Sequence, residues 1–253
     1  MKDRNITRIV ICGSGFGGVY TYMNLHKQLH GRDDIEVIMV SEDDHFLFSP
    51  LLHEVAVGNL PPHSITQPAR TVPQCCLDRV ITGEVHAFDP DNKTIRYDRL
   101  PDDANTKDVI EEDTLSYDYL VMALGSDTDY YGTPGAEDYA LPLKRLSHAS
   151  AIKNSIVQQF QEAQRVEDRH EKKSALRFVI VGGGATGVEL AGELGDLFEN
   201  EMHESFPRLC ELASIHLYEG GDRLLVPNAS MYTYIRILSL RKYMTTACWR
   251  IRR

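Results

Sequence analysis

Two glycine-rich turns of the same pattern constrain this chain of 253 residues more than any other feature. Residues 13–18 read Gly-Ser-Gly-Phe-Gly-Gly and residues 182–187 read Gly-Gly-Gly-Ala-Thr-Gly, so both fit G-x-G-x-x-G. Each turn follows a short apolar run and leads into a segment of small and apolar residues. In such a strand–turn–helix unit the first glycine makes the turn, the second admits a pyrophosphate and the third lets helix and strand pack closely.

The helix that follows each turn adds a second reason to expect phosphate binding. Its N-terminus offers N–H groups and the positive end of the helix dipole to an anion. The two turns therefore predict two dinucleotide sites, and two such sites suggest two cofactors that exchange a hydride. The predicted cofactor-binding residues of the turns are Gly13, Gly15, Phe16, Gly17, Gly18, Gly182, Gly184, Ala185, Thr186 and Gly187.

The other apolar runs predict an α/β chain. Residues 9–12 and 35–40 read as strands on either side of a helix, which is a βαβ opening. Residues 80–97 read as two strands of a meander, and residues 215–218 supply the strand after the second turn. We predict two Rossmann-like domains, the first of which carries the β-meander.

Four other segments carry structural expectations. Residues 119–124 read as a buried strand that Gly125 stops, and Ser147 reads as the N-cap of an amphipathic helix. Residues 46–65 are apolar but interrupted by three prolines, which favours irregular structure. Residues 101–114 are acidic and polar, as in a solvated excursion.

The residue that closes the second strand of each unit would bind an adenosine ribose. Glu219 follows residues 215–218, and a carboxylate there accepts from the ribose 2′-hydroxyl and repels a 2′-phosphate, which favours NADH over NADPH. In the first unit Ser41 and then Glu42 follow the strand. Ser41 stands where the acid is usual, and Glu42 either binds the ribose or is a solvated residue of an acidic run.

Composition excludes several classes of protein. The formal net charge of −10 argues against non-specific binding to nucleic acid. No apolar run approaches the ~18–20 residues that span a bilayer, and the first residues do not read as a signal peptide, so we expect a location on the cytosolic side. The five cysteines show neither a disulfide framework nor a zinc spacing, so we predict no metal site.

Four stretches of the chain carry a resemblance to a known family: GSGFGG, FLFSPLLHEVAVG, YDYLVMALGSDTDYYGTPGAEDYALPLK, and VIVGGGATGVELAGEL with YEGGDRLL. By these stretches the chain resembles the type II NADH dehydrogenases, which reduce quinones without pumping protons. Members of this family are two-dinucleotide-binding flavoproteins of the pyridine nucleotide-disulfide oxidoreductase superfamily, which has a glutathione-reductase-like fold. The resemblance covers about residues 6–227.

The resemblance implies cofactors, domains and further site residues. It implies an FAD-binding domain over residues 1–145, an NADH-binding domain over residues 146–229, and a quinone as electron acceptor. It also implies peripheral contact with the inner face of a membrane, and it leaves a homodimer open. The residues expected along or over the FAD are Ser49, Pro50, Leu51, Leu52, Val85, Ala123, Leu124 and Gly125.

Glu189 is the candidate catalytic residue. It lies just beyond the third glycine of the second turn, with Glu193 one helical turn later on the same face. By resemblance this glutamate sits near the nicotinamide and assists proton delivery to the quinone. The alternative is an acid that the dipole stabilises near a helix start.

The end of the chain departs from the family. Residues 230–253 contain six Lys or Arg and no Asp or Glu, and the family's return to the FAD domain is missing, so both domains are expected to be incomplete. This favours a truncated or frame-shifted reading over a short basic tail at a membrane surface. Two alternatives remain for the function. The chain is either an inactive fragment or another flavoprotein of the superfamily, such as a sulfide:quinone oxidoreductase.

Overall fold

The computed structural model describes residues 6–71, 79–100, 111–221, 223–225 and 244–248. The chain divides into two compact units, of which the first comprises Met1–Phe48 and His63–Asp129. The second comprises Ser49–Pro62 and Tyr130–Arg253. The short segment Ser49–Pro62 therefore packs in the second unit, although both of its neighbours in the sequence belong to the first. Which cofactor each domain binds stays a prediction.

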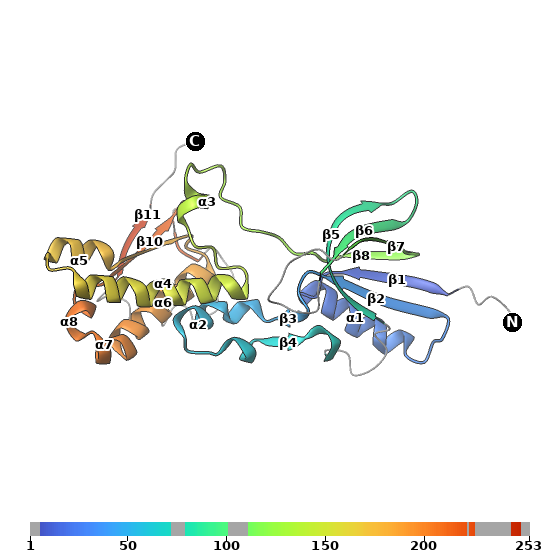
Figure 1. Ribbon diagram of the computed structural model, residues 1–253, viewed down its shortest axis with the longest axis horizontal. Coiled ribbons are helices and arrows are strands. Elements are labelled where there is room, and N and C mark those ends of the chain that lie inside the picture. The colour runs from blue at the N-terminus through green and yellow to red at the C-terminus, as the bar shows by residue number, and fades with distance from the viewer. Residues whose placement is uncertain (1–5, 72–78, 101–110, 222, 226–243, 249–253) are drawn as a thin grey trace. The chain divides into compact units, whose positions relative to one another are not determined.

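The first unit contains a six-stranded mixed sheet in the order β7-β6-β5-β2-β1-β8 (Figure 1). β1, β2, β5 and β8 are parallel, and β6 and β7 continue from β5 as an antiparallel meander. The strands are Thr7–Cys12 (β1), Ile35–Ser41 (β2), Arg79–Asp89 (β5), Thr94–Arg99 (β6), Glu111–Ser116 (β7) and Tyr119–Met122 (β8). The predicted βαβ opening and meander are confirmed.

Helix α1, Phe16–Leu29, connects β1 to β2, and the core of this unit follows from the alternation of side chains along β1. Val10 and Cys12 face a cluster with the meander strands, whereas Ile9 and Ile11 pack with Tyr22 of α1. Both faces of the central strand are thus buried, as a parallel sheet requires. A separate pair of short antiparallel strands, β3 (His45–Leu47) and β4 (Thr66–Pro68), lies near two 3-10 turns, η2 (Pro62–Ser64) and η3 (Ala69–Thr71).

The second unit is built on a three-stranded parallel sheet in the order β11-β10-β9. Its strands are Arg177–Val181 (β9), Ser214–Glu219 (β10) and Met244–Cys248 (β11). Its helices are Leu52–Val57 (α2), Ala136–Tyr139 (α3), Leu146–Arg165 (α4), Arg169–Ala175 (α5), Ala185–Glu199 (α6), Glu201–Ser205 (α7) and Pro207–Cys210 (α8). The core has an aromatic centre, in which the Phe198 ring lies 5.0 Å from Phe178 and 5.5 Å from Phe160 between centroids.

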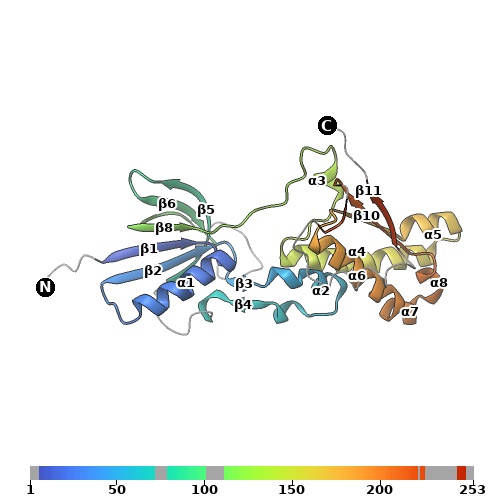
Figure 2. The ribbon, with the colours of Figure 1, turned by 180° about the vertical axis from the view of Figure 1, so that it is seen from behind.

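The α/β fold class is confirmed, but α2 corrects the expectation of irregular structure over residues 46–65. A 3-10 turn, Ser49–Leu51 (η1), leads directly into α2, which packs against both α4 and α6 (Figures 1 and 2). Pro50 lies in the turn before the helix, and Gly58 ends the helix with a φ of 94° ahead of Pro61. The prolines therefore bracket a short buried helix and do not interrupt it.

Three smaller expectations were also wrong. Helix α4 has Arg145 as its N-cap, not Ser147, because the His148 ring accepts from the Arg145 backbone N–H at 3.2 Å. Residues 111–114 belong to strand β7, which pairs with β6. Strand β8 is the sheet edge, and Tyr119 is 64% exposed, so this strand is not buried.

Two observations concern the end of the chain and the membrane. Most of the basic tail, residues 230–253, lies outside the described residues, but Met244–Cys248 form a strand parallel to β10. Within the described part of the chain, none of the helices combines the length and the apolar composition that crossing a membrane needs.

Candidate functional site

The first glycine turn has the backbone geometry that its sequence predicts. Gly13 adopts a φ of 106°, which favours glycine, and its N–H donates to the carbonyl of Val40 at 2.7 Å. A Cβ on Gly18 would fall 1.9 Å from the Gly13 carbonyl oxygen, and one on Gly13 would fall 2.2 Å from that of Ala123. The turn, the start of α1 and the end of β8 are therefore in closer contact than any side chain would allow.

The second turn repeats this geometry. Gly182 has a φ of 109°, and its N–H donates to the carbonyl of Tyr218 at 2.8 Å. A Cβ on Gly187 would fall 2.0 Å from the Gly182 carbonyl oxygen. In contrast, a Cβ on Gly15 or on Gly184 would meet no atom within 4 Å, so the middle of each turn faces open space.

That open space suits a pyrophosphate. Gly15 and Gly184 are the N-caps of α1 and α6, and neither helix, both of which are fully described, has a side-chain cap or an acid in its first turn. The first N–H groups are therefore not occupied by side chains of the turn and can donate to an anion. The residues of both turns fit the phosphates of a dinucleotide.

The residue that ends the second strand of each unit is bonded to the glycine turn. Glu219, the last residue of β10, accepts from Gly183 N–H at 2.5 Å and from Gly221 N–H at 2.8 Å. Hydrogen bonds from the N–H groups of Gly221 and Gly183 hold the pKa of Glu219 below its usual value. These two hydrogen bonds therefore favour the charged form of the carboxylate and hold it at the edge of the turn.

Ser41, the last residue of β2, occupies the same place in the first unit. Its Oγ accepts from Ser14 N–H at 3.1 Å and donates to Ser14 Oγ at 2.9 Å. Ser41 is buried, whereas Glu42 beside it is half-buried. The structure thus gives Ser41 a role in the turn, and a ribose contact by either residue stays a prediction.

The remaining predicted FAD residues fall into two groups. Ala123 lies on the first turn, where its Cβ is 3.2 Å from the position of a Cβ on Gly17, and Leu124 beyond it is exposed. Phe16 packs edge-on against Phe46, with centroids 5.0 Å apart. Val85 stands on β5, where the pairing with β6 shifts register. Ser49, Pro50, Leu51 and Leu52 belong to the second unit, and their placement along a flavin stays a prediction.

Glu189 lies in the second turn of α6, and the structure brings His53 of α2 toward it. His53 Nδ1 is 3.7 Å from Glu189 Oε2, and His53 Nε2 is 3.9 Å from Glu54 Oε1. The Asn59 amide donates to Glu54 Oε2 at 3.0 Å and to Glu193 Oε2 at 2.6 Å. Glu189 is therefore one end of a polar group within the second unit.

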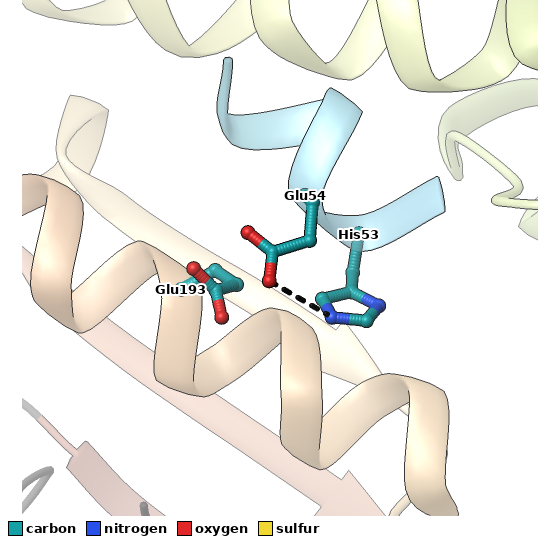
Figure 3. Close-up of side chains that lie close together, drawn as sticks. All are labelled: His53, Glu54 and Glu193. Atoms are coloured by element: carbon teal, nitrogen blue, oxygen red, sulfur yellow. Dashed lines mark ion pairs between the residues drawn. The ribbon is translucent and has the colours of Figure 1, made fainter. Parts of the chain in front are cut away.

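This group was missed by sequence reasoning, apart from the shared face of Glu189 and Glu193. Figure 3 shows His53, Glu54 and Glu193 lying close together. Each of them offers a nitrogen or carboxylate oxygen atom, and these atoms lie within 4.8 Å of one another. Glu193 is only 1% exposed although it carries a carboxylate. The available signal was its place among the apolar residues Leu190, Ala191 and Leu194 of the same helix, because a buried acid needs partners.

Two G-x-G-x-x-G turns, each at the carboxyl end of a parallel strand, define an α/β protein of the two-dinucleotide-binding class. The model of the pyridine nucleotide-disulphide oxidoreductase family matches residues 7–234. The chain therefore belongs to this family.

Individual relatives show which members of this family the chain is similar to. A probable NADH dehydrogenase of Dictyostelium discoideum is 33% identical over 220 residues, which are 86% of this chain and 46% of that protein. The type II NADH:quinone oxidoreductase Ndh of Mycobacterium tuberculosis is 31% identical over 222 residues, or 87% of this chain and 45% of that one. The resemblance to type II NADH dehydrogenases is confirmed, and the chain spans less than half the length of these relatives.

A solved structure agrees with this assignment. The NDH2 of Plasmodium falciparum in complex with NADH superposes with a TM-score of 0.80 at 26% identity, covering 95% of this chain and 48% of that one. The sulfide:quinone oxidoreductase of Aquifex aeolicus is similar in fold, with a TM-score of 0.65 at 17% identity.

Proposed function

We propose that this chain is the dinucleotide-binding part of an FAD-dependent NADH:quinone oxidoreductase. The observation that carries the proposal is the repeated turn geometry, in which Gly15 and Gly184 face open space in front of an uncapped helix N-terminus. The relatives' names and the NADH bound to a similar structure support the choice of nucleotide and acceptor.

The first turn would hold the FAD. The N–H groups at the start of α1 would donate to its pyrophosphate, and Ala123 would close over the turn from the end of β8. Ser41 keeps the turn in shape through Ser14, and Glu42, the next residue, would bind the ribose. When bound, FAD supplies the hydride-accepting and electron-transferring chemistry.

The second turn would hold the NADH. Gly184 admits the pyrophosphate, and Glu219 presents a charged carboxylate beside the turn. A carboxylate attracts the 2′-hydroxyl of NADH and repels the 2′-phosphate of NADPH, so NADH is the preferred donor.

Glu189 would deliver protons to the quinone. Quinone reduction takes up protons as well as electrons, and a carboxyl group near the reacting ring can deliver them. The chain's own contribution is therefore orientation of the two nucleotides and proton delivery. The same proposal includes peripheral contact of the protein with the inner face of a membrane, from which it would take up the quinone.

Cofactor binding by the purified 253-residue chain tests the proposal. The chain would be mixed with FAD, freed of excess by gel filtration, and titrated with NADH, NADPH or sulfide while the flavin absorbance is recorded. A yellow protein that NADH bleaches and whose colour a soluble quinone restores would support the proposal, although weak flavin retention and little quinone reduction are expected of a chain without the family's return segment. A chain that retains no flavin and binds no NADH would be the inactive fragment, and bleaching by sulfide alone would indicate the sulfide-oxidising class.

Two variants serve as controls for one another. Gly15→Ala should weaken flavin retention without affecting NADH binding, and Gly184→Ala should do the reverse. Neither added methyl group meets another atom within 4 Å, so the fold should be kept. If both variants lose the same cofactor, the assignment of one nucleotide to each turn is wrong.

A further inference from the structure

The imidazole of His53 lies between two carboxylates from different helices. Its Nδ1 is 3.7 Å from Glu189 Oε2 on α6, and its Nε2 is 3.9 Å from Glu54 Oε1 on its own helix α2. His53 is only 6% exposed. A buried ring with one acid at each nitrogen can take up a proton on one side and release a proton on the other.

Behind Glu54 the polar group continues into the core of the second unit. The Asn59 amide nitrogen donates to both Glu54 and Glu193, and the Glu193 side chain is buried. The Glu54 side chain is 20% exposed, so it connects the group with solvent. Other charged groups nearby are Asp196, which interacts with Glu54, and Lys153 of α4, which lies against Gly58 at the end of α2.

We propose that His53 relays protons from Glu54 to Glu189, and that Asn59 and Glu193 hold Glu54 in place for this transfer. The proposal rests on the function proposed above, because it assumes that Glu189 delivers a proton to the quinone. His53 acts through Glu189 and does not touch the reacting atoms, so it is a positioning and relay residue.

The proton balance requires such a supply. Reduction of a quinone to a quinol takes two electrons and two protons, whereas the hydride of NADH carries two electrons and one proton. The second proton must come from the medium. Glu189 gives this proton to a quinone oxygen. His53 then passes its Nδ1 proton to Glu189 while its Nε2 takes a proton from Glu54, so the ring stays neutral, and Glu54 recovers a proton from the solvent.

The two distances leave room for this transfer. Both exceed the length of a direct hydrogen bond, but a small ring rotation or one bridging water would connect each pair. Catalytic hydrogen bonds are commonly longer without substrate than with it. Each passage leaves the ring in its other tautomer, and a ring flip or exchange with water restores the first.

Nuclear magnetic resonance on the chain without cofactors tests the arrangement independently of activity. The two ring nitrogens of ¹⁵N-labelled His53 would be recorded in the unchanged chain and in the Glu189→Gln and Glu54→Gln variants. We expect Glu189→Gln to shift chiefly the Nδ1 signal and Glu54→Gln chiefly the Nε2 signal. A ring that responds to only one of the two acids, or to neither, overturns the relay.

Stopped-flow kinetics on the chain reconstituted with FAD tests the consequence. His53→Gln keeps hydrogen-bonding atoms but cannot titrate, so it should slow reoxidation by quinone about tenfold, below the ~100-fold or more ascribed to a direct acid–base group. Flavin reduction by NADH should be unchanged. The matched control is His203→Gln, which removes an exposed histidine of α7 in the same unit.

Added imidazole separates a relay from a structural role. In a His53→Gly variant, the vacated space should admit imidazole and restore reoxidation in a concentration-dependent manner. Equal slowing of both half-reactions by His53→Gln, or rescue by none of the imidazoles tried, overturns the proposal. If the unchanged chain shows no flavin reduction by NADH, the proposed function fails, and the nuclear magnetic resonance result alone then decides whether His53 couples the two acids.

Discussion

Replacing Gly187 by alanine should destabilise the second unit, whereas the same change at Gly184 should not. A Cβ on Gly187 would fall 2.0 Å from the Gly182 carbonyl oxygen and 3.2 Å from its carbon, and one on Gly184 would meet nothing within 4 Å. Backbone atoms cannot rotate away as a side chain does. The turn would therefore have to open, and the start of α6 would have to shift away from the end of β9.

The expected size of the effect follows from the kind of clash. Overpacking typically costs 1–3 kcal/mol, and a clash with backbone places Gly187→Ala at about 3 kcal/mol in the free energy of unfolding. For a domain of 150–250 residues this corresponds to a loss of roughly 6–12 °C in Tm, and the second unit is slightly smaller, so we expect a loss near the upper end of that range. At Gly184 two effects offset each other: alanine is a poorer N-cap by up to ~1 kcal/mol, but it lowers the entropy of the unfolded chain by about 0.4–1 kcal/mol.

Gly184→Ala should instead affect NADH binding. Its methyl group would stand where the pyrophosphate is proposed to approach the helix N-terminus. Loss of one hydrogen bond to a charged group costs about 1.5–3 kcal/mol, which is roughly a 10- to 150-fold increase in Kd.

Two measurements check this pair of variants. Thermal unfolding followed by circular dichroism without nucleotide gives the stability, and a fluorescence titration with NADH gives the affinity. The pair Gly18→Ala and Gly15→Ala repeats the comparison in the first unit, where a Cβ on Gly18 would fall 1.9 Å from the Gly13 oxygen. Equal losses of stability in Gly187→Ala and Gly184→Ala, or full NADH affinity in Gly184→Ala, would refute the reasoning.

Three further predictions concern Glu219, the buried cysteines and Asp196. Glu219→Gln should weaken NADH binding by roughly 1–3 kcal/mol and reduce the preference over NADPH, because the charged acceptor beside the turn is lost; unchanged preference in parallel titrations would remove Glu219 from the site. Burial raises the pKa of Cys12, like that of Cys210, to about 11, so the thiolate fraction at pH 8 is on the order of 0.1%. Neither should be alkylated by iodoacetamide in the folded chain, and mass spectrometry showing rapid labelling of Cys12 would contradict this. Burial, together with Glu199 and Glu54, raises the pKa of Asp196, so its contribution to stability is present at low pH and lost as pH rises through the folded-state pKa. Asp196→Asn should therefore gain stability relative to the parent between pH 4 and pH 7 in urea unfolding, and a gain that is the same at both pH values would assign the effect to packing.

Much of the fold could be predicted because its signals are local. The positive φ at Gly13 and at Gly182 requires only that each of these residues be glycine. The close packing of Gly18 and Gly187 involves backbone atoms only five residues away along the chain. The meander could be predicted from the sequence as well, since β5 and β6 are joined by a short turn. Such features depend on few neighbours, so they can be read from the order of residues.

Helix α2 shows where local signals mislead. Three prolines suggested irregular structure, but they lie before and after the helix, and burial against α4 and α6 stabilises the six residues between them. Propensity is a weak prior for so short a helix, because tertiary packing supplies most of its stability. The exposure of β8 was missed for a related reason, since it depends on which strands lie alongside. The start of α4 was placed two residues late, because the His148 ring bonds to the backbone of Arg145.

The sequence alone determined where the chain can turn and approach a phosphate, because those properties belong to glycine itself. The tertiary structure alone decided that His53 meets Glu189, and that Asn59 bonds to Glu193, a residue 134 positions away along the chain. No periodicity links α2 with α6, and their contact exists only because both helices bury apolar faces in one core. The polar group between them is therefore a product of packing, and its chemistry became visible only once that packing was known.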